Sequence, residues 1–96
     1  MEFTHVDGDD TIAVTIFSLS TCGHCRRTKT FLQEKGIAYD YIDVDLLSGE
    51  TFTEVYDLVK SYNPRGSFPT IVIGEKKQVI VGDRLDEIAA AVGIAI

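Results

Sequence analysis

Two short segments rich in β-branched residues flank a longer segment with a helical pattern, and this alternation is the strongest constraint on the fold. Residues 11–19 (TIAVTIFSL) are too short for a typical helix and predict a buried strand. Residues 23–35 contain no proline, carry an apolar face and are followed by Gly36, where a helix can end. Residues 37–44 (IAYDYIDV) then predict a second strand. A strand–helix–strand unit implies two parallel strands joined by a right-handed crossover.

The second half of the chain predicts a second helix followed by a β-hairpin. Ser48 or Thr51 can cap this helix, which ends before Pro64. Residues 70–73 and 78–81 are short β-rich runs separated by four turn-forming residues. Because a hairpin joins antiparallel strands, the sheet is expected to be mixed.

A third helix completes the pattern. Asp83 can cap it, an apolar face follows, and Gly93 stands just past its end. The order β-α-β-α-β-β-α predicts an α/β protein with a mixed sheet of about four strands flanked by three helices. This is the order of elements in thioredoxin-like folds.

The length and the charge of the chain restrict its organisation and its partners. Ninety-six residues suffice for one domain with a single core. Residues 1–10 are polar and aperiodic, which predicts a short lead-in to a domain at residues 11–96. The lead-in has no apolar run like that of a signal peptide, and no apolar stretch is long enough to cross a bilayer, so we expect a cytoplasmic protein that does not bind membranes. The net charge of −6 argues against nucleic acid as a partner.

Cys22 and Cys25 lie where the first strand meets the first helix, separated by Gly23 and His24. Free backbone N–H groups and the positive end of the helix dipole favour a thiolate at Cys22, and the thiolate is the species that attacks a disulfide. Cys25 lies one turn further along the helix and is expected to be more shielded. These positions predict that Cys22 forms a mixed disulfide with the substrate and that Cys25 then attacks Cys22 to release the product.

His24 is a candidate for tuning this chemistry. It can donate a hydrogen bond or carry positive charge beside the thiolate, which predicts a stabilised reduced form and a less reducing couple. Residues 20–35 support this interpretation, because they contain four Lys or Arg residues against one Glu, a local charge of +3. The simpler alternatives are that His24 is an exposed loop residue and that the basic run is a solvated helix face.

Other uses of a close cysteine pair fit this sequence less well. A Zn²⁺ site needs four ligands, and the sequence adds only His24 and His5 to the pair, so no metal site is predicted. Covalent haem attachment needs a histidine after the second cysteine, where Arg26 stands. A pair of inert core cysteines is disfavoured by the glycine and histidine between them.

The sequence resembles the glutaredoxin family of the thioredoxin superfamily over residues 12–93. The resemblance rests on residues 17–21 (FSLST) directly before the Cys-Gly-His-Cys motif, on residues 67–70 (SFPT) and on residues 81–83 (VGD) before the last helix. It implies that residues 11–96 form a glutaredoxin-like domain.

The resemblance also implies where a substrate binds. In this family the proline that opens the third strand of the core follows a cis peptide bond and lies beside the cysteines, which predicts a cis bond between Phe68 and Pro69. An extended substrate, glutathione or a peptide, is then expected to pair with the main chain of Phe68. The alternative for Pro69 is an ordinary proline at the entry to a strand.

Several positions depart from the family pattern. Leu19 stands where a lysine that meets a glutathione carboxylate is common, and Arg65 is the candidate replacement for that cation. The paired glycines and acidic residue near the last helix correspond to Gly82 and Asp83. The Gly-His pair between the cysteines is similar to that of protein disulfide isomerases. The residues expected to bind substrate are Phe68, Pro69, Gly82, Asp83 and Arg65.

The leading functional interpretation is a dithiol oxidoreductase that reduces or exchanges protein disulfides or glutathione mixed disulfides. We expect a monomer without a bound cofactor, active in electron transport and cell redox homeostasis, with glutathione or a thioredoxin-type reductase as its reductant. The alternative is an iron–sulfur or metal carrier in which two chains share Cys22 and glutathione. Such carriers typically have one cysteine followed by Gly-Phe-Ser, whereas Cys25 occupies the serine position here. A structural or adaptor role is a third option, and the tyrosines are interpreted as packing residues.

Overall fold

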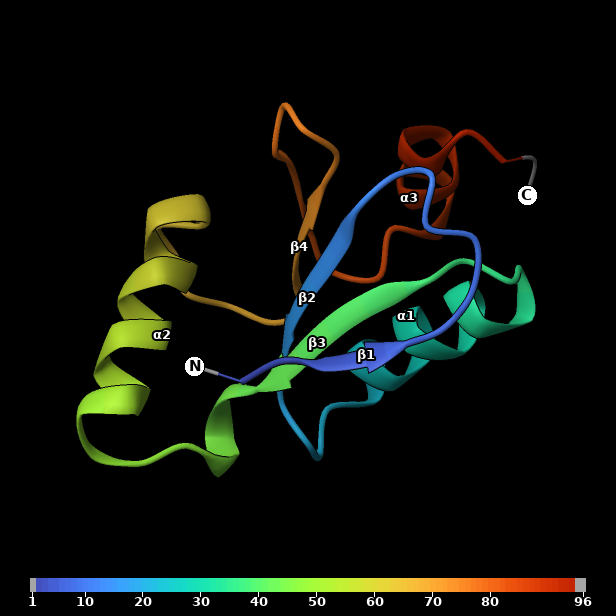
Figure 1. The fold of residues 1–96 in the computed structure, drawn as a ribbon. Helices are drawn as coiled ribbons and strands as arrows, with labels where there is room; N and C mark the ends of the chain where they lie inside the picture. Colours follow the sequence, from blue (N-terminus) through green and yellow to red (C-terminus); the bar gives the residue numbers. More distant parts are fainter. Residues whose placement is uncertain (1, 95–96) are drawn as a thin grey trace.

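A mixed five-stranded sheet forms the middle layer of the fold, with helices on both faces (Figure 1). The structure is a computed structural model that describes residues 2–94, so residue 1 of the predicted lead-in and residues 95–96 of the predicted domain lie outside it. The predicted α/β class is confirmed, and the sheet has one strand more than expected. The elements are β1 (Thr4–Val6), β2 (Val14–Ser18), α1 (Gly23–Glu34), β3 (Tyr39–Asp43), the 3₁₀ turn η1 (Val44–Leu46), α2 (Gly49–Tyr62), β4 (Thr70–Ile73), β5 (Gln78–Val81) and α3 (Leu85–Val92).

Strand β2 lies at the centre of the sheet, in the order β1-β3-β2-β4-β5. It pairs in parallel with β3, where Ile16 lies opposite Tyr41, and antiparallel with β4, where Phe17 lies opposite Thr70. These pairings confirm the predicted crossover, and β4 and β5 form the predicted hairpin. Because β2 and β4 run in opposite directions, the segment that leaves β2 and the segment that enters β4 lie at the same end of the sheet.

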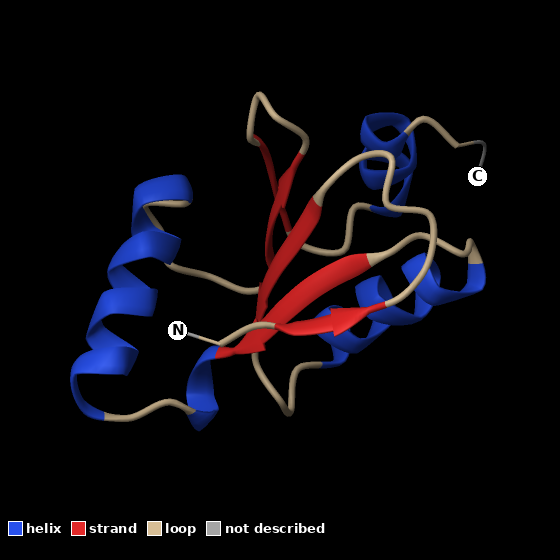
Figure 2. Cartoon of the chain, in the orientation of Figure 1, coloured by secondary structure: helices blue, strands red, loops and turns tan. Residues whose placement is uncertain are grey.

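The N-terminal segment belongs to the sheet, so the prediction of a polar lead-in is wrong for β1. This strand pairs antiparallel with β3, and His5 Nδ1 lies 2.8 Å from Asp40 Oδ1 across the pair. The loop that follows is tied down as well, since Asp9 exchanges backbone hydrogen bonds with Gly36 and Ala38 at 2.7 and 3.0 Å. Figure 2 shows this long loop crossing to β2. β1 is a three-residue edge strand held by backbone hydrogen bonds to β3. Because its side chains are mostly exposed, its sequence shows no alternation of apolar and polar residues that would predict a strand.

Two clusters of buried side chains lie on opposite faces of the sheet. Helices α1 and α3 cover one face, and α2 covers the other (Figure 1). The first cluster includes Ile16, Leu32, Tyr39, Ile71 and Ile88, and the second includes Phe17, Ile42, Val44, Val55, Val59 and Val72. The cysteine motif lies directly after the C-terminal end of β2, at one end of the sheet.

The helix starts do not use the predicted side-chain caps. The Ser48 side chain makes no capping hydrogen bond although α2 begins directly after it, and Thr51 lies inside that helix. Helix α3 begins after Arg84 rather than after Asp83. The predicted end of α3 is confirmed, because Gly93 takes a left-handed φ of 77° just past it.

Candidate active site

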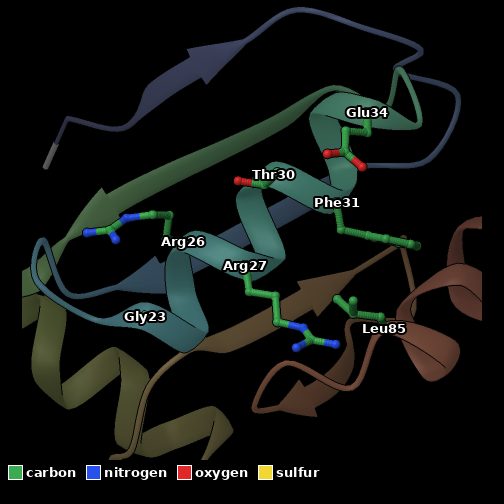
Figure 3. Close-up of a pocket in the computed structure, with 7 residues that line it drawn as sticks. All are labelled: Gly23, Arg26, Arg27, Thr30, Phe31, Glu34 and Leu85. Atoms are coloured by element: carbon green, nitrogen blue, oxygen red, sulfur yellow. The ribbon is translucent and has the colours of Figure 1, made fainter.

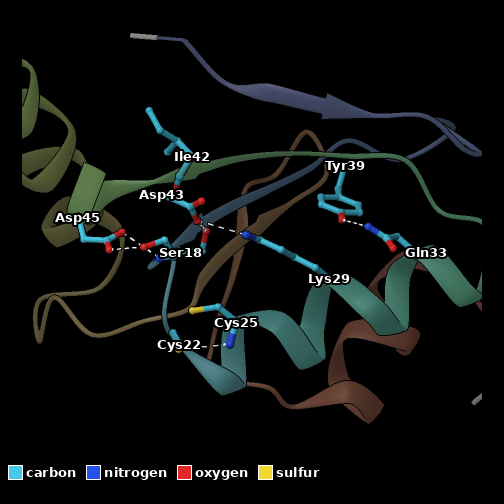
Figure 4. A network of polar contacts seen from close by, with 10 residues as sticks. Ser18, Cys22, Cys25, Lys29, Gln33, Tyr39, Ile42, Asp43 and Asp45 are labelled. Carbon is cyan, nitrogen blue, oxygen red and sulfur yellow. Dashed lines mark hydrogen bonds and ion pairs between the residues drawn. The ribbon is translucent and has the colours of Figure 1, made fainter. Parts of the chain in front are cut away.

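Cys22 is the N-cap residue of α1, and its own sulfur is the capping group. Its backbone is extended, with φ −93° and ψ 117°, and its Sγ accepts the Cys25 N–H at 3.2 Å (Figure 4). The Cys22 carbonyl accepts the Arg26 N–H at 3.0 Å, which is the first bond of the helix. The half-exposed sulfur therefore lies at the N-terminus of α1, beside free helical N–H groups and the positive end of the helix dipole.

Cys25 lies in the opposite environment. Its side chain is fully buried, and burial, together with the hydrogen bond to Cys22, raises the pKa of the Cys25 thiol to about 12. Its sulfur therefore stays protonated at neutral pH. The predicted division between an accessible Cys22 and a shielded Cys25 agrees with this geometry.

A polar network near the two cysteines was not predicted. Lys29 Nζ lies 3.2 Å from Asp43 Oδ1, and the same oxygen accepts the Ser18 hydroxyl at 2.6 Å (Figure 4). Lys29 also lies over the Tyr41 ring, 3.9 Å from its centroid. The ammonium charge opposes the effect of burial on the pKa of Cys25. One signal existed in the sequence: Lys29 follows Cys25 by four residues and so lies on the same helix face.

His24 pairs with Asp83, a contact that joins the cysteine motif to the segment before α3. Nδ1 of His24 lies 3.1 Å from Asp83 Oδ2, and Arg27 Nε lies 3.6 Å from the same oxygen. The hydrogen bond from His24 is the main cause that holds the pKa of Asp83 below its usual value. Within residues 2–94, His24 makes no hydrogen bond to the Cys22 sulfur. The effect of His24 on the Cys22 thiolate therefore remains a prediction. The sequence predicts Asp83 as the cap of α3, whereas in the structure its side chain pairs with His24.

The segment that enters β4 lies at the same end of the sheet as the cysteines. The Phe68–Pro69 peptide bond is cis, as predicted, and the Gly82 N–H donates to the Pro69 carbonyl at 2.9 Å. Gly82 has a φ of 91°, a conformation that favours glycine. In the described part of the chain the backbone N–H and C=O of Phe68 make no hydrogen bond. They are available to an extended substrate, as the resemblance implies.

Asn63 holds the loop between α2 and β4, a role that the sequence did not reveal. It is 5% exposed, and its Nδ2 donates to the Ser67 carbonyl at 3.2 Å and to Thr70 Oγ1 at 3.1 Å. Arg65 lies in this loop, where its backbone N–H donates to Asn63 Oδ1 at 3.2 Å. The Arg65 side chain is exposed, and its role toward substrate remains a prediction.

Two hollows flank the cysteine motif. One, of about 380 Å³, lies along the outer side of α1, where Arg27 extends toward Leu85 and Phe31 while Arg26 extends away from them (Figure 3). The other, of about 300 Å³, lies toward α2 and is lined by Leu19, Val44, Asp45, Phe52, Tyr56 and Phe68. The first hollow is lined by two arginines and by Glu34, whereas the lining of the second is mainly apolar.

Comparison with known proteins identifies the family. A family model described as glutaredoxin matches residues 14–79, which is more than half of the chain. The chain belongs to the glutaredoxin family. The element order and the close cysteine pair of this glutaredoxin agree with that membership.

Solved structures similar to this glutaredoxin include two archaeal proteins. A glutaredoxin from Methanosarcina mazei Go1 is 35% identical, with a TM-score of 0.82 over 96% of this chain and 88% of that one. Methanoredoxin from Methanosarcina acetivorans is 34% identical, with a TM-score of 0.79 over 85% of each chain. Glutathione S-transferase Z1 from Arabidopsis thaliana is 33% identical over 76 residues, 79% of this chain and 31% of that protein. The chain spans less than half the length of the first curated relatives it matches.

Between residues 2 and 94, no group of three or more His, Cys, Asp or Glu side chains is arranged to hold a metal ion. Among the helices described, none is long and apolar enough to span a bilayer.

Proposed function

We propose that this glutaredoxin is a dithiol thiol–disulfide oxidoreductase that reduces or exchanges protein disulfides or glutathione mixed disulfides. The observation that carries this proposal is the contrast between the two sulfurs. Cys22 Sγ is half-exposed at a helix N-terminus, whereas Cys25 is buried with its pKa raised to about 12. In this proposal the Cys22 sulfur is the nucleophile that attacks the substrate, and the Cys25 sulfur reacts in the second exchange.

The reaction proceeds in two exchanges. The Cys22 thiolate attacks one sulfur of the substrate disulfide, so the substrate S–S bond breaks and the other sulfur leaves as a thiolate that takes a proton from solvent. Cys25 then loses its proton and attacks Cys22 Sγ, which breaks the mixed disulfide and releases the second substrate thiol. The substrate gains two electrons and two protons, and Cys22 and Cys25 become a disulfide. Two thiols of glutathione or of a thioredoxin-type reductase restore the dithiol.

The raised pKa of Cys25 determines the order of the two exchanges. While Cys22 is a thiolate, burial and the Cys22 sulfur both keep Cys25 protonated. A mixed disulfide removes the charge from Cys22, which favours deprotonation of Cys25. Cys25 therefore becomes a nucleophile after the substrate is attached. With two cysteines and no disulfide framework, the protein is proposed to act as a monomer in the reducing cytoplasm.

Trapping of the mixed disulfide tests the proposal. Cys25→Ser removes the second exchange, so we expect this variant to accumulate a Cys22 adduct with glutathione disulfide and with protein disulfides, detected by intact mass. Cys22→Ser is the matched control and should form none. Absence of any adduct on Cys25→Ser would contradict the proposal, and a coloured, iron-containing dimer would favour the carrier function instead. Supplying electrons through glutathione reductase or thioredoxin reductase then distinguishes the two reductants.

A further inference from the structure

The hollow toward α2, called here the aromatic groove, is lined by Leu19, Val44, Asp45, Phe52, Tyr56 and Phe68. It is continuous with the reactive site on two sides. Leu19 accepts the Cys22 N–H on its carbonyl at 3.3 Å, and Phe68 directly precedes the cis-proline. A substrate segment that brings its sulfur to Cys22 and pairs with the main chain of Phe68 therefore lies against this groove.

The walls of the groove are held in place before any ligand binds. The Tyr56 ring stacks on Phe52 and on Phe68, with centroids 5.6 and 6.2 Å apart. The Tyr56 hydroxyl donates to the Gly66 carbonyl at 3.2 Å, and a side chain at Gly66 would collide with that hydroxyl. The Tyr56 ring is therefore packed directly against the backbone of this loop. A groove with preformed walls loses little conformational entropy when it binds a side chain.

The charges around the groove favour an apolar occupant over an anion. The charged residue of the lining is Asp45, whose carboxylate accepts the Ser20 N–H at 2.8 Å and the Ser20 hydroxyl. These hydrogen bonds lower the pKa of Asp45, which keeps it ionised. Lys60 lies over the Tyr56 ring at 5.0 Å and beside Asp57 at 3.7 Å, outside the lining. A carboxylate in the groove would face Asp45 without a cation among the lining residues.

We propose that the aromatic groove binds a bulky apolar or aromatic side chain next to the reactive cysteine of an extended protein substrate. This inference rests on the proposed function and gives the site a substrate class. About 300 Å³ is enough for one large side chain, and Phe52, which is 38% exposed, supplies apolar surface that a side chain can cover. The groove thereby discriminates against substrates that carry a carboxylate in this place.

Symmetric peptide disulfides test the proposal, because attack on either sulfur gives the same product. Three peptides carry Phe, Ala or Glu on both sides of the cysteine, and the rate of mixed-disulfide formation with Cys25→Ser is measured by quenched mass spectrometry. Each rate is divided by that of the same peptide with dithiothreitol. We expect the Phe peptide to react about tenfold faster than the Ala peptide, as partial burial of an aromatic ring predicts. The Glu peptide should be slowest.

A second substitution in the Cys25→Ser background locates the effect. Phe52→Ala should reduce the advantage of the Phe peptide over the Ala peptide to about threefold or less. Leu46→Ala, which removes an apolar side chain that is 71% exposed and outside the lining, should retain it. Equal rates for the Phe and Ala peptides, or an advantage that stays at about tenfold in Phe52→Ala, would overturn the inference and leave the oxidoreductase function intact. Failure of every peptide to react would instead contradict the proposed function.

Discussion

The two faces of the sheet are covered to different degrees. On one face, α1 buries four of its twelve residues and packs beside α3. On the other face α2 lies alone, and it buries two of its fourteen residues although it carries an apolar stripe. The aromatic side chains left half-exposed by α2 form the wall of the groove beside Cys22. The α1/α3 face is therefore expected to contribute most of the stability, whereas the α2 face leaves exposed the apolar surface that we propose binds substrate.

Leu32→Ala should have the largest effect, because it opens a cavity in the well-covered face. Leu32 is fully buried in the cluster beneath α1 and α3, and we expect the free energy of unfolding to fall by about 2–5 kcal/mol. Urea unfolding followed by circular dichroism measures this loss. Leu46→Ala is the control and should change stability by less than about 0.5 kcal/mol. A loss below about 1 kcal/mol at Leu32 would show that this face is not the main source of stability.

The buried Cys25 thiol should make the stability of the protein fall at high pH. This thiol has a pKa raised from 9.0 to about 12 in the folded state, so the unfolded chain releases this proton first as the pH rises above about 9. The unfolded state then binds fewer protons, and stability falls. Relative to Cys25→Ser, the reduced protein should lose about 1.4 kcal/mol between neutral pH and pH 10. Parallel urea curves for the two proteins in reductant measure the difference, and identical pH dependences would contradict a buried neutral thiol.

Phe52→Ala should have only a small effect on stability, because its ring is partly exposed and lines the groove rather than the core. We expect a loss of less than about 1 kcal/mol, mainly from the stacking on Tyr56. Val55→Ala in the same helix removes a fully buried side chain and should cost about 1–3 kcal/mol. Thermal unfolding of the pair provides the measurement. A larger loss of stability for Phe52→Ala than for Val55→Ala would show that the Phe52 ring belongs to the core rather than to the groove.

The local parts of the structure and the crossover from β2 through α1 to β3 were predictable from the sequence, whereas side-chain contacts between distant residues were not. The hairpin strands begin and end at the predicted residues, and Cys22 lies at the predicted strand–helix boundary, because these features depend on neighbouring residues. The pairing of His24 with Asp83 joins residues 59 positions apart. The sequence did not reveal it, because Asp83 also fits the local role of a helix cap. The aromatic groove depends on how α2 lies against the sheet. Tyr56 was therefore interpreted as a packing residue, although it also lines the groove.

The capping of α1 by the Cys22 sulfur couples helix geometry to the oxidation state of the protein. In the proposed reaction Cys22 bonds to a substrate or to Cys25, and the acceptor of the Cys25 N–H then changes from a free Cys22 sulfur to a disulfide sulfur. Under the proposed function, we therefore expect the first turn of α1 to be held more firmly in the reduced protein than in either disulfide form. We expect the chemical shift of the Cys25 amide proton to differ between the reduced protein, the mixed disulfide and the Cys22–Cys25 disulfide, so that it reports the oxidation state of the site.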